Sequence, residues 1–220
     1  MPLARTVIFD FDGTLVDSLE VGFRAANVVA PKFGVRTVGR AEADTFREMS
    51  TREMFVHLGV PLRKVPGLVV AVRDEMARVM PTVRLFDGIA DGLRQLHESG
   101  IELGVVSSNS RRNVRSCLDR NGVLGLFDFV HTALNLFGKH RTIRRVLRTR
   151  GLAASRVAYV GDESRDVEAA RRCQVLGVAV SWGSKSRAQL GQHRPDHIVD
   201  SPRELTRLLL GDGGGGCVSP

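Results

Sequence analysis

The chain has 220 residues, of which 43% are hydrophobic and 25% are charged. This composition excludes a disordered or fibrous protein, and the length accommodates one core domain with a modest insertion. The formal net charge of +8 favours anionic partners without specifying their class.

Signals for secretion, membrane insertion and disulfide bonding are missing from the sequence. The cysteines are odd in number and lack the spacing of a zinc site: Cys117, Cys173 and Cys217. A charged strand follows Met1 almost at once, and no apolar run approaches the length of about 18 residues that spans a membrane. We therefore expect a cytoplasmic protein with no membrane partner, either a monomer or a homodimer.

The first predicted strand ends in two acids. The apolar run 7–9 is followed by Asp10 and Asp12 and then by a turn at Gly13 and Thr14. If the strand continued, both carboxylates would point the same way, which is costly without a cation or a shared proton. Because α/β sheets bind ligands at the carboxyl ends of their strands, the pair is a candidate metal and phosphate site. The alternative is an ordinary turn, in which Asp and Gly are common.

A helical region follows this strand. Residues 18–83 show helical periodicity and no convincing strand, so we expect an all-helical insertion, which we call the cap. Its linkers to the rest of the chain, near 17–19 and 83–87, are candidate hinges. Pro66 and Gly67 are expected to break the last helix. The predicted helices cover 19–33, 41–49, 51–58 and 63–80.

The remainder alternates between strand and helix patterns. Such alternation predicts an α/β core with a doubly wound, Rossmann-like parallel sheet covered on both faces, built from residues 1–17 and 84–210. The Gly-rich tail 211–220 is expected to be disordered. The predicted strands cover 101–106, 129–132, 157–160, 175–180 and 197–199, and the predicted helices cover 88–98, 111–121, 139–150, 164–172, a short segment near 187, and 202–210.

Small polar residues follow the strand 101–106. Ser107, Ser108 and Asn109 precede a helix, and their hydroxyl and backbone N–H groups can hold a phosphate. The alternative is that Asn109 or Ser110 only caps that helix.

Two further strand ends carry charged candidates. Lys139 begins a helix, where its charge opposes the helix dipole, although a single surface lysine remains the alternative. Asp162 and Asp166 lie four residues apart where a strand becomes a helix, and both can offer the oxygen ligands that Mg²⁺ prefers. Their alternative role is to stabilise the helix dipole. Glu163 is expected to be peripheral.

These positions occur in the order of four known motifs, and residues 6 to 210 resemble the haloacid dehalogenase-like hydrolase superfamily. The motifs are Asp10-x-Asp12-Gly13-Thr14, Ser107, Lys139 and Gly161-Asp162-x-x-x-Asp166. The chain is most similar to the phosphoglycolate phosphatase-like group of that superfamily. The stretches that carry this likeness are 86–89, 106–110, 137–139 and 160–166.

The resemblance implies a Mg²⁺-dependent phosphatase that hydrolyses small phosphate monoesters through an aspartyl-phosphate, with phosphoglycolate as one candidate substrate. It implies a small phosphorylated metabolite as partner. The implied catalytic residues are Asp10, Asp12, Ser107 and Lys139. The implied phosphate-binding residues are Gly13, Thr14, Ser107, Ser108, Asn109 and Lys139. The implied magnesium ligands are Asp10, Asp12 through its backbone carbonyl, Asp162 and Asp166.

Other functions are weighed against this one. Asp12 disfavours a dehalogenase or a phosphonate hydrolase, which commonly lack it. A sugar-phosphate mutase retains it but commonly has Val in place of Thr14. A non-catalytic or nucleic-acid-binding protein on the same fold is the remaining alternative. The basic helix 139–150 is interpreted as a solvated face, because no aromatic stacking residues accompany its arginines, and we expect no nucleic-acid partner.

Overall fold

A computed structural model describes residues 2–133 and 138–211 and contains one six-stranded parallel sheet. The strand order is β3-β2-β1-β4-β5-β6, so the sheet is built outward in both directions from β1. This is the predicted Rossmann-like α/β architecture. The strands are β1 (Thr6–Phe9), β2 (Glu102–Ser107), β3 (Phe129–Thr132), β4 (Val157–Gly161), β5 (Leu176–Val180) and β6 (His197–Val199).

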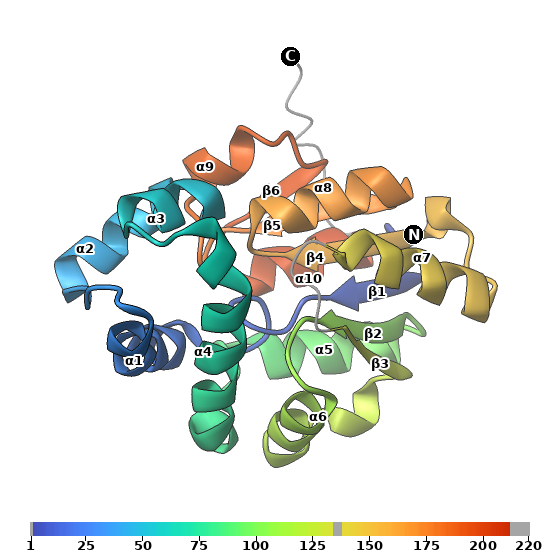
Figure 1. The fold of residues 1–220 in the computed structure, drawn as a ribbon. Helices are drawn as coiled ribbons and strands as arrows, with labels where there is room; N and C mark the ends of the chain where they lie inside the picture. The colour runs from blue at the N-terminus through green and yellow to red at the C-terminus, as the bar shows by residue number, and fades with distance from the viewer. Residues whose placement is uncertain (1, 134–137, 212–220) are drawn as a thin grey trace.

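Alternation along β1 places apolar side chains on both faces of the sheet. Val7 and Phe9 pack in the cluster that includes residues of α5, α6 and α10, whereas Ile8 packs with α7 and α8. All three side chains are fully buried, as expected for a central parallel strand. The covering helices, visible on either side of the sheet in Figure 1, are α5 (Ile89–Glu98), α6 (Arg111–Arg120), α7 (Lys139–Arg150), α8 (Ser164–Cys173), α9 (Arg187–Gly191) and α10 (Pro202–Leu210).

The segment between β1 and α5 is helical, and Figure 1 shows it beside the sheet rather than over one of its faces. Its helices have their own apolar cluster, which includes Val29, Val65 and Leu68. They are α1 (Leu19–Val29), η1 (Ala30–Phe33), α2 (Arg40–Thr45), η2 (Phe46–Glu48), α3 (Thr51–His57), η3 (Leu62–Lys64), α4 (Val65–Val79) and η4 (Met80–Thr82). The cap bounds of 18–83 remain a prediction.

The predicted break at Pro66 and Gly67 is wrong. Helix α4 runs without interruption from Val65, and Pro66 lies in its first turn. A proline there loses no intrahelical hydrogen bond, because the first N–H groups of a helix have no partner within it.

The two linkers of the cap are hydrogen-bonded to one another. The amide of Asp17 donates to the carbonyl of Arg84 at 3.0 Å, and the amide of Phe86 donates to the carbonyl of Leu15 at 3.1 Å. An antiparallel bridge joins Val16 to Leu85 between them. The two linkers between the core and the cap therefore lie side by side as one short two-stranded ribbon, and both predicted hinges are in it.

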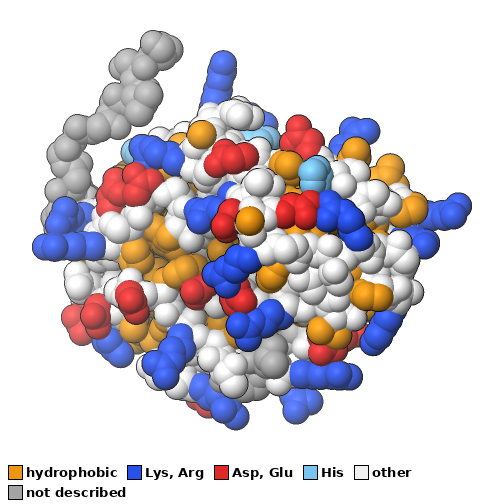
Figure 2. Space-filling view, turned by 90° about the vertical axis from the view of Figure 1, so that its left-hand side faces the viewer, with side chains coloured by type: hydrophobic (Ala, Val, Ile, Leu, Met, Phe, Trp, Pro, Cys, Tyr) orange, Lys and Arg blue, Asp and Glu red, His pale blue; other side chains and the backbone are white. Residues whose placement is uncertain are grey.

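The basic helix α7 presents its arginines to solvent, as the sequence predicted. Its apolar residues Ile143 and Val146 are buried, whereas Arg141, Arg144, Arg145, Arg148 and Arg150 are exposed. On the other side of the molecule, where the cap lies, Figure 2 shows Lys and Arg side chains interspersed with acidic ones instead of forming one continuous patch.

The remaining predictions concern the cysteines and the chain's tail. Cys117 and Cys173 are buried free thiols, and burial raises the pKa of both. Cys217 and the tail beyond Gly211 lie outside the described residues. Within residues 2–133 and 138–211, no helix combines the length and apolar character that crossing a membrane requires.

Candidate active site

Three carboxylates meet where β1 and β4 end. Phe9 of β1 pairs with Val160 of β4, so Asp10 and Asp162 follow neighbouring strands at the same edge of the sheet. Asp166, in the first turn of α8, joins them. One carboxylate oxygen from each of these three residues lies within 4.8 Å of the others. Their exposed fractions are 3%, 1% and 2%, so these acids are removed from water and close together.

The ammonium group of Lys139 lies among these acids. Its Nζ is 2.7 Å from Oδ2 of Asp10 and also pairs with Oδ1 of Asp166. Lys139 is only 6% exposed, which rules out the alternative of a surface lysine. Burial works against its charge, but the two carboxylates outweigh burial and raise the pKa of Lys139. Its position at the start of α7 is therefore explained by its acidic partners and not by helix stability.

The pKa values of Asp162 and Asp166 are raised to about 7 and about 6. Burial is the main cause for both, and the Asp10 carboxylate adds to it. For Asp166 the ammonium of Lys139 acts in the opposite direction. The guanidinium of Arg165 also lowers the pKa of Asp166, so two cations, Lys139 and Arg165, act on these carboxylates.

Glu163 serves a structural role next to this cluster. It forms a reciprocal capping box with Asp166 at the start of α8, in which its backbone N–H donates to Oδ2 of Asp166 at 3.1 Å. Its own carboxylate accepts from Nη2 of Arg165 at 2.6 Å. Glu163 therefore fixes the Asp166 side chain, which goes beyond the peripheral position expected from the sequence.

The turn after β1 holds Asp162 from one side. The hydroxyl of Thr14 donates to Oδ1 of Asp162 at 2.9 Å. Gly13 has φ of +73°, and a Cβ atom there would lie 2.3 Å from Oδ2 of Asp162. Glycine is therefore required at position 13 both by its backbone conformation and by the proximity of Asp162. The sequence predicted Gly13 and Thr14 as phosphate-binding residues, and the structure places both against a predicted metal ligand.

Asp12 has a different environment from Asp10. Its Oδ2 accepts a hydrogen bond from Nδ2 of Asn109 at 3.0 Å. Among the described residues, its Oδ1 is buried without a hydrogen-bond partner. Burial raises the pKa of Asp12, and the hydrogen bond from Asn109 opposes that rise. Its side chain is outside the three-carboxylate group, which is consistent with the predicted ligation through its backbone carbonyl.

Asn109 is itself held in one orientation. Its Oδ1 accepts from the amide of Ser110 at 2.8 Å and from Nδ2 of Asn113 at 3.0 Å. These two donors fix the carbonyl end of the side chain, so its amide end points to Asp12. The sequence identified Asn109 as a phosphate-binding candidate or a helix cap and did not indicate this contact.

The three serines at and after the end of β2 have different contacts. Ser110 is the residue that caps α6, because its hydroxyl accepts from the amide of Asn113 at 3.2 Å. Ser107 is buried at the strand end, where its hydroxyl accepts from the amide of Asn109 at 3.0 Å. Ser108 is half-buried on the same turn. Because Ser110 caps α6, neither Ser107 nor Ser108 is needed as the helix cap.

The sequence analysis missed the residues that follow β5. Nε1 of Trp182 donates to the carbonyl of Thr14 at 3.1 Å, and the amide of Ser184 donates to Oδ2 of Asp162 at 2.7 Å. A Cβ atom on Gly183 would lie 2.3 Å from both Cβ of Asp162 and the carbonyl oxygen of Gly13. The available signal was the position of these residues at a fifth strand end, with the chain's one tryptophan among them.

Comparison with known proteins identifies the family. Residues 7–180 match the family model described as haloacid dehalogenase-like hydrolase. The chain belongs to this family. A phosphoglycolate phosphatase from Synechococcus elongatus is 37% identical over 205 residues, which cover 93% of this chain and 97% of that protein. The predicted superfamily and its phosphatase class are confirmed.

Solved structures share the fold of this chain. The crystal structure of a predicted phosphatase from Clostridium acetobutylicum has a TM-score of 0.82 at 23% identity and covers 95% of this chain and 99% of its own. The structure of CbbY from Rhodobacter sphaeroides in complex with phosphate has a TM-score of 0.70 at 21% identity, with coverages of 92% and 96%. The predicted α/β fold is confirmed across nearly the whole chain.

The donor set of this hydrolase fits a magnesium ion. Asp10, Asp162 and Asp166 offer only oxygen atoms, which are the ligands that Mg²⁺ takes. Burial is the main cause of the raised pKa values of Asp162 and Asp166, and neighbouring carboxylates add to it. A bound divalent cation would favour the ionised form of these carboxylates.

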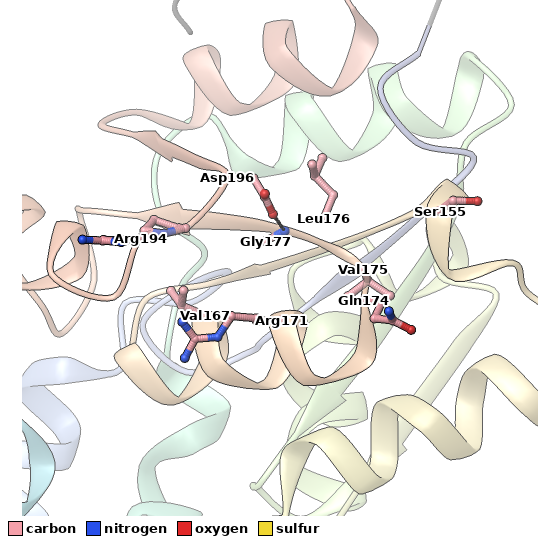
Figure 3. A pocket seen from close by; sticks show the side chains of 10 residues that line it. Ser155, Val167, Arg171, Gln174, Val175, Leu176, Gly177, Arg194 and Asp196 are labelled. Atoms are coloured by element: carbon pink, nitrogen blue, oxygen red, sulfur yellow. Dashed lines mark hydrogen bonds between the residues drawn. The ribbon is translucent and has the colours of Figure 1, made fainter. Parts of the chain in front are cut away.

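A cavity of about 400 Å³ lies at the amino ends of the strands, on the opposite side of the sheet from the acid cluster (Figure 3). It includes Gly177, whose amide donates to Asp196 at 2.7 Å, and it lies at the amino end of β5. The acid cluster is at the carboxyl ends of the strands, so this cavity does not hold the reacting group. Its lining residues are Ser155, Val167, Arg171, Gln174, Val175, Leu176, Gly177, Arg194, Pro195 and Asp196.

Proposed function

We propose that this protein is a Mg²⁺-dependent phosphatase of small phosphate monoesters that works through an aspartyl-phosphate on Asp10. The observation that carries the proposal is the contrast between two neighbouring acids. Asp10 is ion-paired with Lys139 at 2.7 Å inside the carboxylate cluster, whereas Asp12 is bound by the neutral amide of Asn109. Asp10 thus has a cation beside it and Asp12 has a raised pKa, which suits a nucleophile beside a general acid.

In the first step, a carboxylate oxygen of Asp10 attacks the phosphorus of the ester. The bond between phosphorus and the ester oxygen breaks, and the carboxyl group of Asp12 gives its proton to the departing oxygen. The products of this step are an alcohol, an aspartyl-phosphate on Asp10 and an ionised Asp12. The hydrogen bond from Asn109 to Asp12 orients the acid for this transfer.

In the second step, Asp12 acts as a base. Its carboxylate takes a proton from water, and the resulting hydroxide attacks the phosphorus of the aspartyl-phosphate. The bond to Asp10 breaks, which releases inorganic phosphate and restores both carboxyl groups to their starting states. The same residue therefore moves one proton in each direction during a turnover.

Charge on the phosphate would be balanced by Lys139 and by a metal ion held at the carboxylate cluster. Lys139, already beside Asp10, would bind a phosphate oxygen, and Ser107 would donate a hydrogen bond to another. Asp10, the backbone carbonyl of Asp12, Asp162 and Asp166 would hold Mg²⁺. When bound, Mg²⁺ supplies electrostatic stabilisation of the phosphoryl group.

The cap is proposed to select the substrate. An enclosing helical insertion admits small esters and excludes phosphate groups on folded proteins. Phosphoglycolate is the first substrate to test, because a relative named phosphoglycolate phosphatase is 37% identical over nearly its whole length. A cytoplasmic location, and a small phosphorylated metabolite as the partner, complete the proposal.

The test is release of phosphate from p-nitrophenyl phosphate and from a panel of phosphorylated metabolites that includes phosphoglycolate. We expect turnover with Mg²⁺ and loss of turnover with EDTA. The matched control for an Asp10→Asn variant is Asp17→Asn, an exposed acid on the same segment. Full activity of Asp10→Asn, or activity that ignores EDTA, would refute the proposed mechanism.

A further inference from the structure

Residues 181–186, between β5 and α9, contact both the acid cluster and the cap, and we call them the strap. On the core side, Trp182 bonds the Thr14 carbonyl and the amide of Ser184 bonds Asp162 at 2.7 Å. Gly183 allows this approach, because a Cβ atom there would overlap Asp162 and Gly13. The strap is thus packed directly against a predicted metal ligand.

On its other side, the strap binds the cap segment η2 and the residue after it. The guanidinium of Arg47 donates to the carbonyl of Ser181 at 2.8 Å, and the amide of Ser186 donates to the carbonyl of Arg47 at 3.2 Å. The hydroxyl of Ser186 bonds Glu48 at 2.7 Å. These contacts join segments more than 130 positions apart in the chain.

Lys185 makes the strap's most unusual contacts with the cap. Its Nζ donates to the carbonyl of Phe46 at 2.7 Å and to the carbonyl of Met49. The side chain is only 5% exposed, and among the described residues no carboxylate forms an ion pair with it. Burial lowers the pKa of Lys185, although Glu163 and Asp162 partly offset that effect.

A buried ammonium bound to carbonyl groups is costly if those groups move away. Removing the 46–49 segment would leave the charge of Lys185 without its hydrogen-bond acceptors, unless water replaced them. The contact therefore favours the position of the cap seen in this structure. The adjacent residue of the strap, Ser184, holds Asp162, so the same short segment bears on both regions.

We propose that Lys185 is a positioning residue that holds the cap closed over the site and, through the strap, keeps Asp162 in place. This inference rests on the proposed phosphatase function and adds to it a residue that determines access. Loss of the ammonium should let the 46–49 segment move away from the strap. Larger phosphate esters should then enter, and the amides of the strap should become less protected from exchange.

The experiment compares Lys185→Met with Lys64→Met. Lys64 is a matched control, because its Nζ also donates to a backbone carbonyl, that of Phe33 at 2.8 Å, but both of these residues belong to the cap. Two quantities are measured. One is hydrogen exchange at the amides of Ser184 and Ser186. The other is the ratio of kcat/KM for a phosphotyrosine peptide to kcat/KM for phosphoglycolate, or for the best small ester of the panel.

In Lys185→Met we expect exchange at both amides to accelerate and the kcat/KM ratio to rise about ten-fold, the order of effect of one hydrogen bond from a charged donor. Lys64→Met should change neither quantity. Arg47→Met removes the hydrogen bond from the cap to the carbonyl of Ser181. Because Arg47 is partly exposed, this variant should change both quantities in the same direction but by less.

The outcomes separate the two proposals. Unchanged exchange and an unchanged ratio in both Lys185→Met and Arg47→Met would overturn the role of Lys185. Equal changes in Lys64→Met would also overturn it, because they would reflect general loosening of the cap. An inactive wild-type enzyme whose strap amides are nevertheless deprotected by Lys185→Met would refute the proposed phosphatase function and support the strap.

Discussion

The carboxyl edge of the sheet and the cap contain charged groups of very different kinds. At the sheet edge, Asp10 and Asp166 are buried, and each forms an ion pair with the buried Lys139. In the cap, pairs such as Arg24 with Glu20 are largely exposed, with side-chain exposures of 76% and 37%. Exposed pairs of this kind contribute about 0 to 1 kcal/mol, whereas breaking a buried pair costs several times more.

The difference matches the proposed division of labour, in which the sheet edge carries out the chemistry and the cap selects the substrate. Residues at the sheet edge are held by contacts with several strand ends, so a change at one position disturbs the others. We expect the surface of the cap to tolerate substitution, apart from its apolar cluster and the 46–49 segment that binds the strap. Substitutions in the two regions should therefore have effects of very different size.

The largest effect is expected for Asp10→Asn. An amide is a poor nucleophile, so turnover and the phosphoenzyme should disappear together, with a loss of about 10⁴-fold or more. The measurement is phosphate release in parallel with a test for acid-stable phosphate on the protein. Asp17→Asn should remain close to wild type, and a comparable loss in that control would remove the distinction between the site and its surroundings.

Asp12→Asn should have the next largest effect. Turnover should fall about 10²- to 10⁴-fold, the usual range for loss of a general acid and base. Because an acidic leaving group departs without protonation, phosphorylation by p-nitrophenyl phosphate should be affected less than phosphorylation by an alkyl phosphate. Single-turnover measurements with both esters test this. Identical losses for the two esters would rule out the acid role of Asp12.

Magnesium should stabilise the folded protein by a smaller amount. Binding to the folded state alone at 100 times the Kd adds about 2.7 kcal/mol, or a few degrees in melting temperature. Asp162→Ala should abolish most of this shift. Replacing Arg145 and Arg148 on the exposed face of α7 should leave it intact. Stabilisation by a short DNA duplex in place of Mg²⁺ would instead favour the nucleic-acid alternative.

A further effect concerns pH in the metal-free protein. The pKa of Asp162 is raised to about 7, above its value of about 3.8 without such an environment. The folded state therefore binds more protons between these two values, so this group's contribution to stability falls as pH rises from about 4 to about 7. Thermal melts in EDTA across this range should show the decline. Asp162→Asn should make this fall in melting temperature smaller. A larger fall in Asp162→Asn than in the wild type would contradict the predicted contribution of Asp162.

Protons should also compete with the metal at the same site. At pH 5 Asp162 and Asp166, with pKa values of about 7 and about 6, are mostly protonated. Mg²⁺ should therefore raise the melting temperature less at pH 5 than at pH 8. An equal rise at both pH values would mean that the ion binds away from these carboxylates.

Much of the α/β core could be predicted from local sequence. Asp10, Ser107 and Asp162 each follow an apolar strand pattern, and the carboxyl ends of parallel strands necessarily lie at one edge. The order β3-β2-β1-β4-β5-β6 brings β1 and β4 side by side, which unites Asp10 with Asp162. Element boundaries agree within a few residues, except for the uninterrupted helix through Pro66.

The contacts that the sequence did not reveal are long-range contacts. Asn109 lies 97 positions from Asp12, and Lys185 lies 139 positions from Phe46. No periodicity or short motif predicts which backbone carbonyl a distant lysine will bind, because that contact depends on how the cap packs against the core. Lys139 was predictable as a site residue only through the family motif, since its buried acidic partners lie in other segments.

The most direct test of the central claim is to locate the covalent phosphate. Asp12→Asn is mixed with p-nitrophenyl phosphate and Mg²⁺, because this variant should be phosphorylated by an ester with a good leaving group and then hydrolysed slowly. The quenched protein is reduced with borohydride, which converts an aspartyl-phosphate to homoserine, and its peptides are analysed by mass spectrometry. We predict homoserine at position 10 and at no other acid. An active enzyme with no modification at Asp10, or with the modification at another residue, would contradict the account.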